Sequence, residues 1–182
     1  MFNVDLTKPL IMLSYFALLD EHGENELEMK ILCESVLEFK NAQIIATYPN
    51  ADAGGRIINE TLDNYAKELN FLKVYPHIER RDFLGLMNIC DVMVGNSSAG
   101  IVELPSFKKP FVYIGTRQKN RLKTENVIDV GYSRDKIIEG IKRALYDEEF
   151  RKKLKSIKNP YGNGKASSKI VKIISEILDG KL

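Results

Sequence analysis

Residues 91–103 have the sequence DVMVGNSSAGIVE, and this stretch decides the fold. The apolar run 92–94 predicts a buried strand, which ends at a Gly-Asn pair. Two serines then open a predicted helix that continues over residues 101–107. A strand, a turn of small residues and the start of a helix, in that order, are typical of α/β proteins, and this geometry also binds phosphate groups.

The turn at residues 95–100, which we call the serine turn, offers several hydrogen-bond donors. The first turn of a helix has backbone N–H groups without intrahelical partners, and the helix dipole places roughly half a positive charge there. Ser97 and Ser98 add hydroxyl groups, and Gly100 allows a ligand to approach the backbone closely. Glu103 would repel a phosphate but can accept hydrogen bonds from the hydroxyls of a sugar. Together these residues predict a nucleotide site.

The same turn has a purely structural interpretation. Ser and Asn are ordinary N-cap residues, and small residues are common wherever a strand leads into a helix. The local pattern alone favours capping over ligand binding, so the segments on either side must decide between the two.

Those segments alternate between predicted strands and predicted helices. This alternation predicts βαβ units and therefore an α/β, Rossmann-like fold with a parallel sheet and helices on both faces. Ligands of such folds bind at the carboxyl ends of the strands, so the loops after each strand are the candidate site. The predicted strands are residues 9–14, 43–48, 71–75, 91–94, 110–114 and 127–130, and the predicted helices are 24–39, 57–69, 81–89, 101–107, 134–146, 148–157 and 165–178.

Composition excludes several classes of function. The 182 residues, with 44% hydrophobic and 29% charged content, predict one globular domain over residues 1–182. The net charge of +2 is too small to predict a nucleic-acid or membrane partner. Residues 1–5 lack the start of a secretory signal, and no apolar stretch reaches the roughly 20 residues that span a bilayer. We therefore expect a cytoplasmic protein.

Neither a metal nor a cofactor is predicted. Cys33 and Cys90 lie in apolar periodic segments, which indicates buried thiols rather than a disulfide or a metal pair. No metal-ligand spacing is present, and no Gly-x-Gly-x-x-Gly fingerprint indicates NAD.

A second motif follows the fifth predicted strand. Arg117 lies in the segment GTRQ, where its planar guanidinium is suited to neutralising a diphosphate. A solvated basic loop is the structural alternative.

Several short segments, taken together and in order, resemble the C-terminal half of the hydrolysing UDP-N-acetylglucosamine 2-epimerases. The resemblance covers nearly all of the chain from Pro9 onward. Several motifs in one order are a stronger signal than any single motif. The segments are YPNADAG (48–54), GNSSAGIVE (95–103), GTRQ (115–118), ENV (125–127) and PYGNGKA (160–166).

The resemblance implies a fold and a set of binding residues. The family has a two-domain, glycosyltransferase-B-type fold, and its C-terminal Rossmann-like domain holds most of the UDP. By the resemblance, the serine turn contacts the diphosphate, Glu103 contacts the ribose, and the loop 76–78 covers the uracil. The implied nucleotide-binding residues are Asn50, His77, Ile78, Ser97, Ser98, Gly100, Glu103 and Arg117.

The resemblance also implies a reaction. The family eliminates UDP across C1 and C2 of UDP-N-acetylglucosamine, and water adds to the glycal intermediate to give N-acetylmannosamine. This chemistry needs a base for the C2 proton and stabilisation of the departing diphosphate. The serine turn and Arg117 can meet the second need.

The chain departs from the family pattern in two places. It has no counterpart of the N-terminal domain, which supplies most of the catalytic carboxylates. After the first strand the family has a histidine followed by proline, and we expect Tyr15 at the histidine position. Tyrosine, with a pKa near 10, cannot replace a group that titrates near neutrality. We expect His22 to be an exposed loop residue rather than a substitute, so the catalytic residues are unknown.

Three functions are compatible with this pattern. The first is a 2-epimerase half that binds UDP or UDP-N-acetylglucosamine and has little or no activity without a separately encoded N-terminal domain. The second is a non-catalytic UDP-sugar-binding module. The third is the donor-binding half of a glycosyltransferase, which the GTRQ segment disfavours. Apolar residues 15–19, at the edge that would meet another domain, are compatible with a surface for self-association and equally with core residues of a longer strand.

Overall fold

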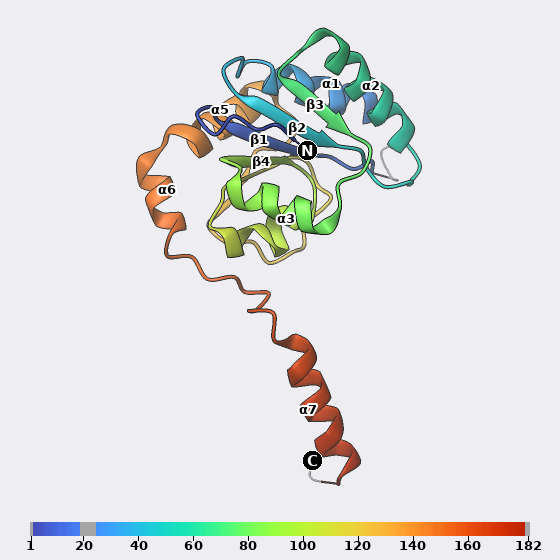
Figure 1. Cartoon of the computed structure of the whole chain (residues 1–182), viewed down its shortest axis with the longest axis vertical. Helices are drawn as coiled ribbons and strands as arrows, with labels where there is room; N and C mark the ends of the chain where they lie inside the picture. Colours follow the sequence, from blue (N-terminus) through green and yellow to red (C-terminus); the bar gives the residue numbers. More distant parts are fainter. Residues whose placement is uncertain (1, 19–24, 181–182) are drawn as a thin grey trace.

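A computed structural model describes residues 2–18 and 25–180 of the chain, and its centre is a six-stranded parallel sheet (Figure 1). The strand order is β3-β2-β1-β4-β5-β6, and every neighbouring pair is parallel. The α/β, Rossmann-like fold is therefore confirmed. The strands are β1 (Leu10–Ser14), β2 (Gln43–Thr47), β3 (Leu72–Tyr75), β4 (Val92–Gly95), β5 (Phe111–Tyr113) and β6 (Val127–Asp129).

Helices cover both faces of the sheet (Figure 1). Helices α1, α2 and α5 share an apolar cluster with Ile11 and Leu13, whereas α3 and α4 share another with Leu10 and Met12. Alternate residues of β1 thus enter opposite layers, which explains why this strand is a continuous apolar run. The helices are α1 (Asn25–Val36), α2 (Gly55–Glu68), α3 (Arg80–Ile89), α4 (Ala99–Val102), α5 (Arg134–Tyr146), α6 (Glu148–Leu154) and α7 (Ala166–Leu178), with a 3-10 helix η1 at Leu104–Phe107.

The helix after the serine turn is shorter than the sequence predicts. Helix α4 has 4 residues, and the chain then tightens into η1, which has Pro105 in its first turn. Proline lacks the N–H that would continue an α-helix, and its ring excludes the carbonyl of the preceding turn. A helix of this length has a small dipole, so the serine turn offers free N–H groups rather than a strong helix field.

Gly100 has a packing role that the sequence does not predict. A Cβ atom at this position would lie 2.5 Å from ring carbons of Phe111 on β5. The open side of Gly100 therefore faces the core, and a contact of its backbone with a nucleotide stays a prediction. The glycine lets α4 lie close against the sheet.

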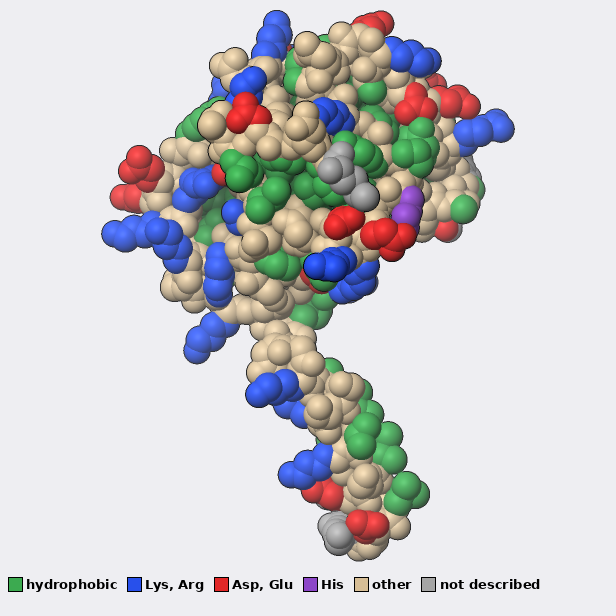
Figure 2. All heavy atoms as spheres, in the orientation of Figure 1, with side chains coloured by type: hydrophobic (Ala, Val, Ile, Leu, Met, Phe, Trp, Pro, Cys, Tyr) green, Lys and Arg blue, Asp and Glu red, His purple; other side chains and the backbone are tan. Residues whose placement is uncertain are grey.

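The exposed apolar side chains are not where the sequence predicts them. Tyr15 and Ala17 are buried, Phe16 and Leu18 are half-buried, and Leu19 lies outside the described residues. Large exposed apolar side chains gather instead on α7, which extends away from the rest of the molecule (Figures 1 and 2). Over the described ranges, no helix is long and apolar enough to cross a membrane.

The contact between Gly100 and Phe111 predicts a specific loss of stability. Gly100→Ala overpacks the core, and we expect the free energy of unfolding to fall by about 1–3 kcal/mol. Gly85→Ala is the matched control, because a Cβ at this position of α3 meets nothing within 4 Å. It should raise the stability by about 0.5–1 kcal/mol through helix propensity. Urea denaturation measures both, and equal midpoints would contradict the packing role.

Candidate functional site

The candidate site lies at the carboxyl ends of β1 and β4, where the strand order reverses. The side chain of Asn96 joins the two strands: its Oδ1 accepts from the N–H of Phe16 at 2.7 Å and its Nδ2 donates to the carbonyl of Phe16 at 2.8 Å. The preceding Gly95 has a φ of 134°, and a Cβ atom there would lie 2.0 Å from the carbonyl oxygen of Ser14. Only glycine permits this approach, so the crevice between the strand ends has a fixed shape.

The two serines of the turn differ in their roles. Ser97 is buried, and its Oγ accepts a hydrogen bond from the N–H of Ala99 at 3.3 Å, which is a capping contact. Ser98 is half-buried, and its hydroxyl has no partner within the described part of the chain. The backbone N–H groups of Ser97 and Ser98 are likewise without a partner there. Capping therefore uses Ser97 only as an acceptor, and the Ser98 hydroxyl and the N–H groups of both serines remain as donors for a ligand.

Arg117 lies beside this turn. Its guanidinium carbon is 4.7 Å from the centre of the Phe16 ring, and its NH1 is 3.5 Å from the carbonyl oxygen of Asn96. Partial burial lowers the pKa of Arg117, and the carboxylate of Asp52 opposes that shift. An arginine remains charged under all ordinary conditions, so a cation lies next to free N–H donors. This combination is suited to an anion.

The position of Arg117 depends on its neighbour Gln118, for which the sequence predicts no role. Gln118 is buried, and its Nε2 donates to the carbonyl of Asn96 at 3.3 Å. Its backbone N–H donates to the hydroxyl of Tyr113 at 2.6 Å. The first bond attaches the loop after β5 to the serine turn, and the second attaches it to the end of β5. Gln118 lies five positions after the end of β5, and its burial has no signature in the sequence.

Glu103 is paired with a residue that the sequence does not single out. Its Oε1 lies 2.8 Å from NH1 of Arg80, the first residue of α3. The side chain of Arg80 is 72% exposed and that of Glu103 is 27% exposed. The pair holds one oxygen of Glu103 and leaves the other for a hydroxyl donor. No local pattern could have predicted this contact, because 23 positions separate its partners.

The remaining predicted residues share this edge of the sheet without converging on the serine turn. The Nδ2 of Asn50 donates to Asp52 at 2.6 Å, and Asp52 in turn interacts electrostatically with Arg117. His77 is exposed and lies 3.3 Å from Glu79. Ile78 is half-buried against the apolar cluster on the α3 face.

Tyr15 does not face the site. Its side chain is 2% exposed, and its hydroxyl donates to Oε2 of Glu28 on α1 at 2.5 Å. Burial and this carboxylate raise the pKa of Tyr15. The next residue, Phe16, lies beneath Arg117, so the side chain that borders the site after β1 is Phe16, and Tyr15 belongs to the core. His22 lies outside the described residues.

Among residues 2–18 and 25–180, no group of three or more His, Cys, Asp or Glu side chains could hold a metal ion.

A cavity of about 270 Å³ opens at the amino ends of β2 and β3, and it is lined by Lys8, Lys40 and Lys73 among others. The serine turn lies at the carboxyl ends of the strands, so this cavity and the candidate site are at opposite ends of the strands.

Comparisons with known proteins agree on one family. The family model for UDP-N-acetylglucosamine 2-epimerase matches residues 11–175. The UDP-N,N'-diacetylbacillosamine 2-epimerase (hydrolyzing) of Legionella pneumophila is 32% identical over 176 residues, which are 97% of this chain and 45% of the relative. The GDP/UDP-N,N'-diacetylbacillosamine 2-epimerase (hydrolyzing) of Campylobacter jejuni is 41% identical over 128 residues, 70% of this chain and 33% of the relative.

Solved structures confirm the fold. The crystal structure of the UDP-GlcNAc 2-epimerase from Neisseria meningitidis bound to UDP-GlcNAc matches with a TM-score of 0.79 at 19% identity, over 95% of this chain and 46% of that chain. The sheet and its helices thus correspond to the C-terminal half of a glycosyltransferase-B-type fold. The chain spans less than half the length of these relatives and corresponds to their C-terminal part. It belongs to the UDP-N-acetylglucosamine 2-epimerase family.

Proposed function

We propose that this chain is the UDP-binding half of a hydrolysing 2-epimerase that acts on a UDP-linked 2-acetamido sugar. The main support for the proposal is the position of Arg117 next to the serine turn. The guanidinium cation there lies beside the unpaired N–H groups of Ser97 and Ser98. Family membership supports the same conclusion, because the matched relatives are named as 2-epimerases of such nucleotide sugars.

The proposed binding mode assigns one part of UDP to each part of the site. The diphosphate accepts from the backbone N–H groups of the serine turn and from the hydroxyl of Ser98, and Arg117 balances its charge. The free oxygen of Glu103 accepts from the ribose hydroxyls, while Arg80 holds the other oxygen. The loop 76–78 covers the uracil through backbone groups, and Asn50 lies at the rim of this pocket.

The chain supplies one part of the reaction. Hydrogen bonds and charge at the serine turn stabilise the diphosphate as it departs from C1. The base for the C2 proton is expected in the amino-terminal half of the relatives, which has no counterpart in residues 1–182. We therefore propose that these residues act as one nucleotide-binding domain with little or no activity without that half.

One observation favours a non-catalytic UDP-sugar-binding module as the second candidate. Because Phe16 borders the site, we assign it, rather than Tyr15, to the position of the family histidine. A phenyl ring neither carries a proton nor donates a hydrogen bond, so any step that needs an imidazole at this position is lost.

The proposed compartment is the cytoplasm. Cys33 and Cys90 are free and buried, and burial raises the pKa of each thiol to about 12. Unpaired cysteines of this kind are typical of proteins in reducing compartments. The proposed partners are UDP, a UDP-linked sugar and the amino-terminal half, with a second copy of the chain as the alternative partner.

The assignment of Arg117 predicts a selective loss of affinity. UDP should bind with a Kd between about 1 µM and 1 mM, and Arg117→Ala should weaken binding at least about tenfold, because the diphosphate loses its nearest cation. Arg121→Ala is the matched control, since Arg121 is exposed in the same loop and should change the Kd less than about twofold. Isothermal titration calorimetry measures both, and equal effects of the two variants would argue against a diphosphate beside the serine turn.

The pairing of Glu103 with Arg80 predicts discrimination at the ribose. The wild-type chain should prefer UDP over 2'-deoxy-UDP by about fivefold or more, because a charged acceptor strengthens the bond to the 2'-hydroxyl. In Glu103→Gln this preference should shrink, whereas Glu139→Gln on α5 should retain it. Competition titrations with the two nucleotides measure the ratio. An unchanged ratio in Glu103→Gln would assign the ribose to other residues.

The missing catalytic groups predict no turnover by the lone chain. UDP release from UDP-N-acetylglucosamine or UDP-N,N'-diacetylbacillosamine should be undetectable in a coupled assay. A fusion that places the amino-terminal half of the Legionella relative before residue 1 should show measurable activity. In that fusion Phe16→His should raise kcat about a hundredfold, and the control Phe16→Leu should not. Robust turnover by residues 1–182 alone would refute the division of roles between the two halves.

A further inference from the structure

The cavity at the amino ends of β2 and β3 combines three lysines with an apolar lining. Its volume of about 270 Å³ is close to the lower limit of pockets that hold small organic molecules. None of the described residues that line it is acidic. A pocket with positive charge and apolar walls is suited to an anion that carries a carbon skeleton.

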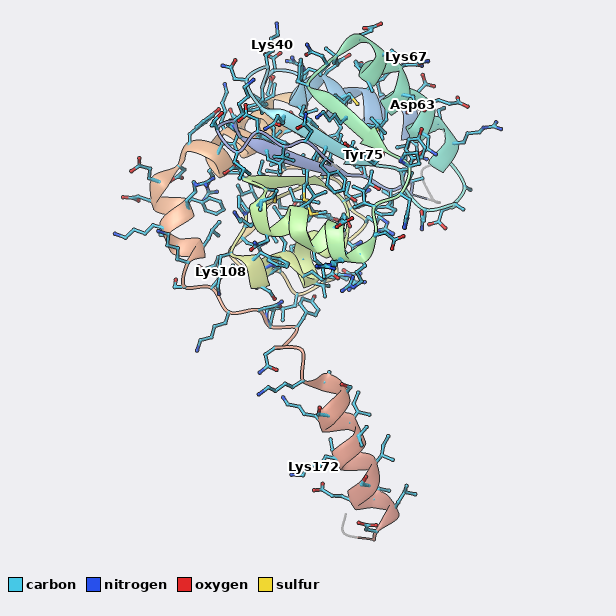
Figure 3. All side chains as sticks on the ribbon, viewed as in Figure 1. Lys40, Asp63, Lys67, Tyr75, Lys108 and Lys172 are labelled. Atoms are coloured by element: carbon cyan, nitrogen blue, oxygen red, sulfur yellow. The ribbon has the colours of Figure 1, made fainter. Side chains whose placement is uncertain are left out.

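One wall of the cavity is the segment 2–8, which we call the strap. The side-chain amide of Gln43, the first residue of β2, holds the strap in place. Its Oε1 accepts from the N–H of Asp5 at 2.8 Å, and its Nε2 donates to the carbonyl of Asp5 at 2.7 Å. The ring of Phe2 packs edge-on against Tyr75 of β3, which is labelled in Figure 3, with 4.9 Å between the ring centres. The strap therefore forms a wall of defined shape.

Lys73 on β3 is a half-buried cation without a carboxylate partner. Its Nζ donates to the carbonyls of Phe2 and Asn3 at 3.2 and 3.3 Å, which fixes the ammonium group against the strap. Within the described ranges, no carboxylate forms an ion pair with it. An ammonium group has three protons, so one remains for a ligand. Cations that are withdrawn from water are normally paired, which makes an anion in this cavity favourable.

Lys8 and Lys40 add two exposed cations to the lining. Neither forms an ion pair with a residue of the described part of the chain. The acidic residue nearest to Lys40 in the sequence is Glu38, and it pairs with Arg134 at the start of α5 instead. Both lysines are therefore available to a ligand.

One carboxylate of the strap reduces the positive charge. Asp5 does not line the cavity, and its Oδ1 accepts from the N–H and the hydroxyl of Thr7 at 3.0 and 2.6 Å. These bonds, together with the charge of Lys8, lower the pKa of Asp5, so this group is an anion at neutral pH. Three lysines and one carboxylate leave a charge of +2, which a dianion would balance.

The chemistry of the lining favours a phosphate group for the charged part of the ligand. Lysine binds phosphate as a point charge, and a phosphate monoester is close to a dianion at pH 7, whereas a single carboxylate carries one charge. The side-chain amide of Asn70 is exposed at the cavity, has no hydrogen-bond partner among the described residues, and adds a donor. The apolar side chains of Val4, Ile44 and Phe71 are suited to the carbon part.

We propose that this cavity binds the phosphate monoester of a small organic molecule at a site separate from the nucleotide site. Strand β2 has 5 residues and spans roughly 15 Å, so the cavity is distant from the carboxyl ends of the strands. The phosphate group contacts the three lysines, and the carbon part packs between the strap and Phe71. A bound ligand thus joins the strap to β2 and β3 and stabilises the folded chain. This site does not depend on UDP binding.

Phenyl phosphate is the probe for this site, and phenyl sulfate is its matched control, because it has nearly the same shape and one negative charge fewer. In an NMR titration of the chain, phenyl phosphate should shift the amides of residues 2–8, 40–45 and 70–73 with a Kd below about 1 mM. Phenyl sulfate should bind at least about fivefold more weakly, because it leaves one cation unbalanced. Inorganic phosphate should also bind more weakly, because it has no apolar part.

A pair of double variants tests the role of the lysines. Lys8→Ala/Lys40→Ala changes two exposed side chains and should raise the Kd for phenyl phosphate at least about tenfold. Lys169→Ala/Lys172→Ala on α7 removes the same charge and should change the Kd less than about twofold. Lys40 and Lys172 lie at opposite ends of the molecule, as Figure 3 shows, so this control leaves the cavity unchanged.

Three results would overturn the proposal. Shifts confined to the serine turn, together with displacement of phenyl phosphate by UDP, would assign the phosphate group to the nucleotide site. Equal affinity for phenyl phosphate and phenyl sulfate, with equal losses in both double variants, would indicate attraction by net charge alone. The absence of saturable shifts up to about 10 mM phenyl phosphate would exclude a site of useful affinity. A UDP titration of the same samples reports on the nucleotide site independently, so failure of either site is recognised.

Discussion

The side chain of Asn96 joins β1 and β4 at the reversal of the sheet, and the rest of the candidate site is arranged around it. The side-chain amide of Asn96 forms two hydrogen bonds to the backbone of Phe16. The backbone carbonyl of Asn96 accepts from the side chains of Arg117 and Gln118. Asn96 is fully buried, so leaving either end of its amide unpaired would cost about 1–3 kcal/mol. One residue thereby fixes the end of β1, the serine turn and the loop after β5.

The sheet could be predicted from the sequence because parallel strands are buried on both faces. Such strands are short continuous apolar runs, and the helices between them show their own periodicity. The prediction of a helix over residues 101–107 was wrong, because Pro105 ends α4 after one turn. The packing role of Gly100 was missed for a different reason. Its function is set by Phe111, a residue on another strand, and no local pattern contains that contact.

The location of the candidate site could be predicted from the sequence, whereas several contacts of its side chains could not. Loops after parallel strands meet at one edge of a sheet, so the serine turn and Arg117 could be expected together. Whether Tyr15 or Phe16 faces that edge depends on the direction of one side chain, which the hydrogen bond from Tyr15 to Glu28 decides. The ion pair of Arg80 with Glu103 joins the start of α3 to the residue between α4 and η1, and it has no signature in the sequence.

Two unsatisfied surfaces of this chain have a common physical remedy. Hydrogen bonds from open N–H groups to a diphosphate compete with water, so each contributes only about 0.5–1.5 kcal/mol until water is excluded. The serine turn forms one wall of such a site, and a second wall has to exclude the water. The apolar side chains of α7 are exposed as well, and Tyr161, which precedes α7, donates to the carbonyl of Leu122 in the loop that carries Arg117. Exclusion of water would favour both surfaces, because it strengthens the hydrogen bonds of the serine turn to an anion and buries the apolar side chains that stabilise a short helix.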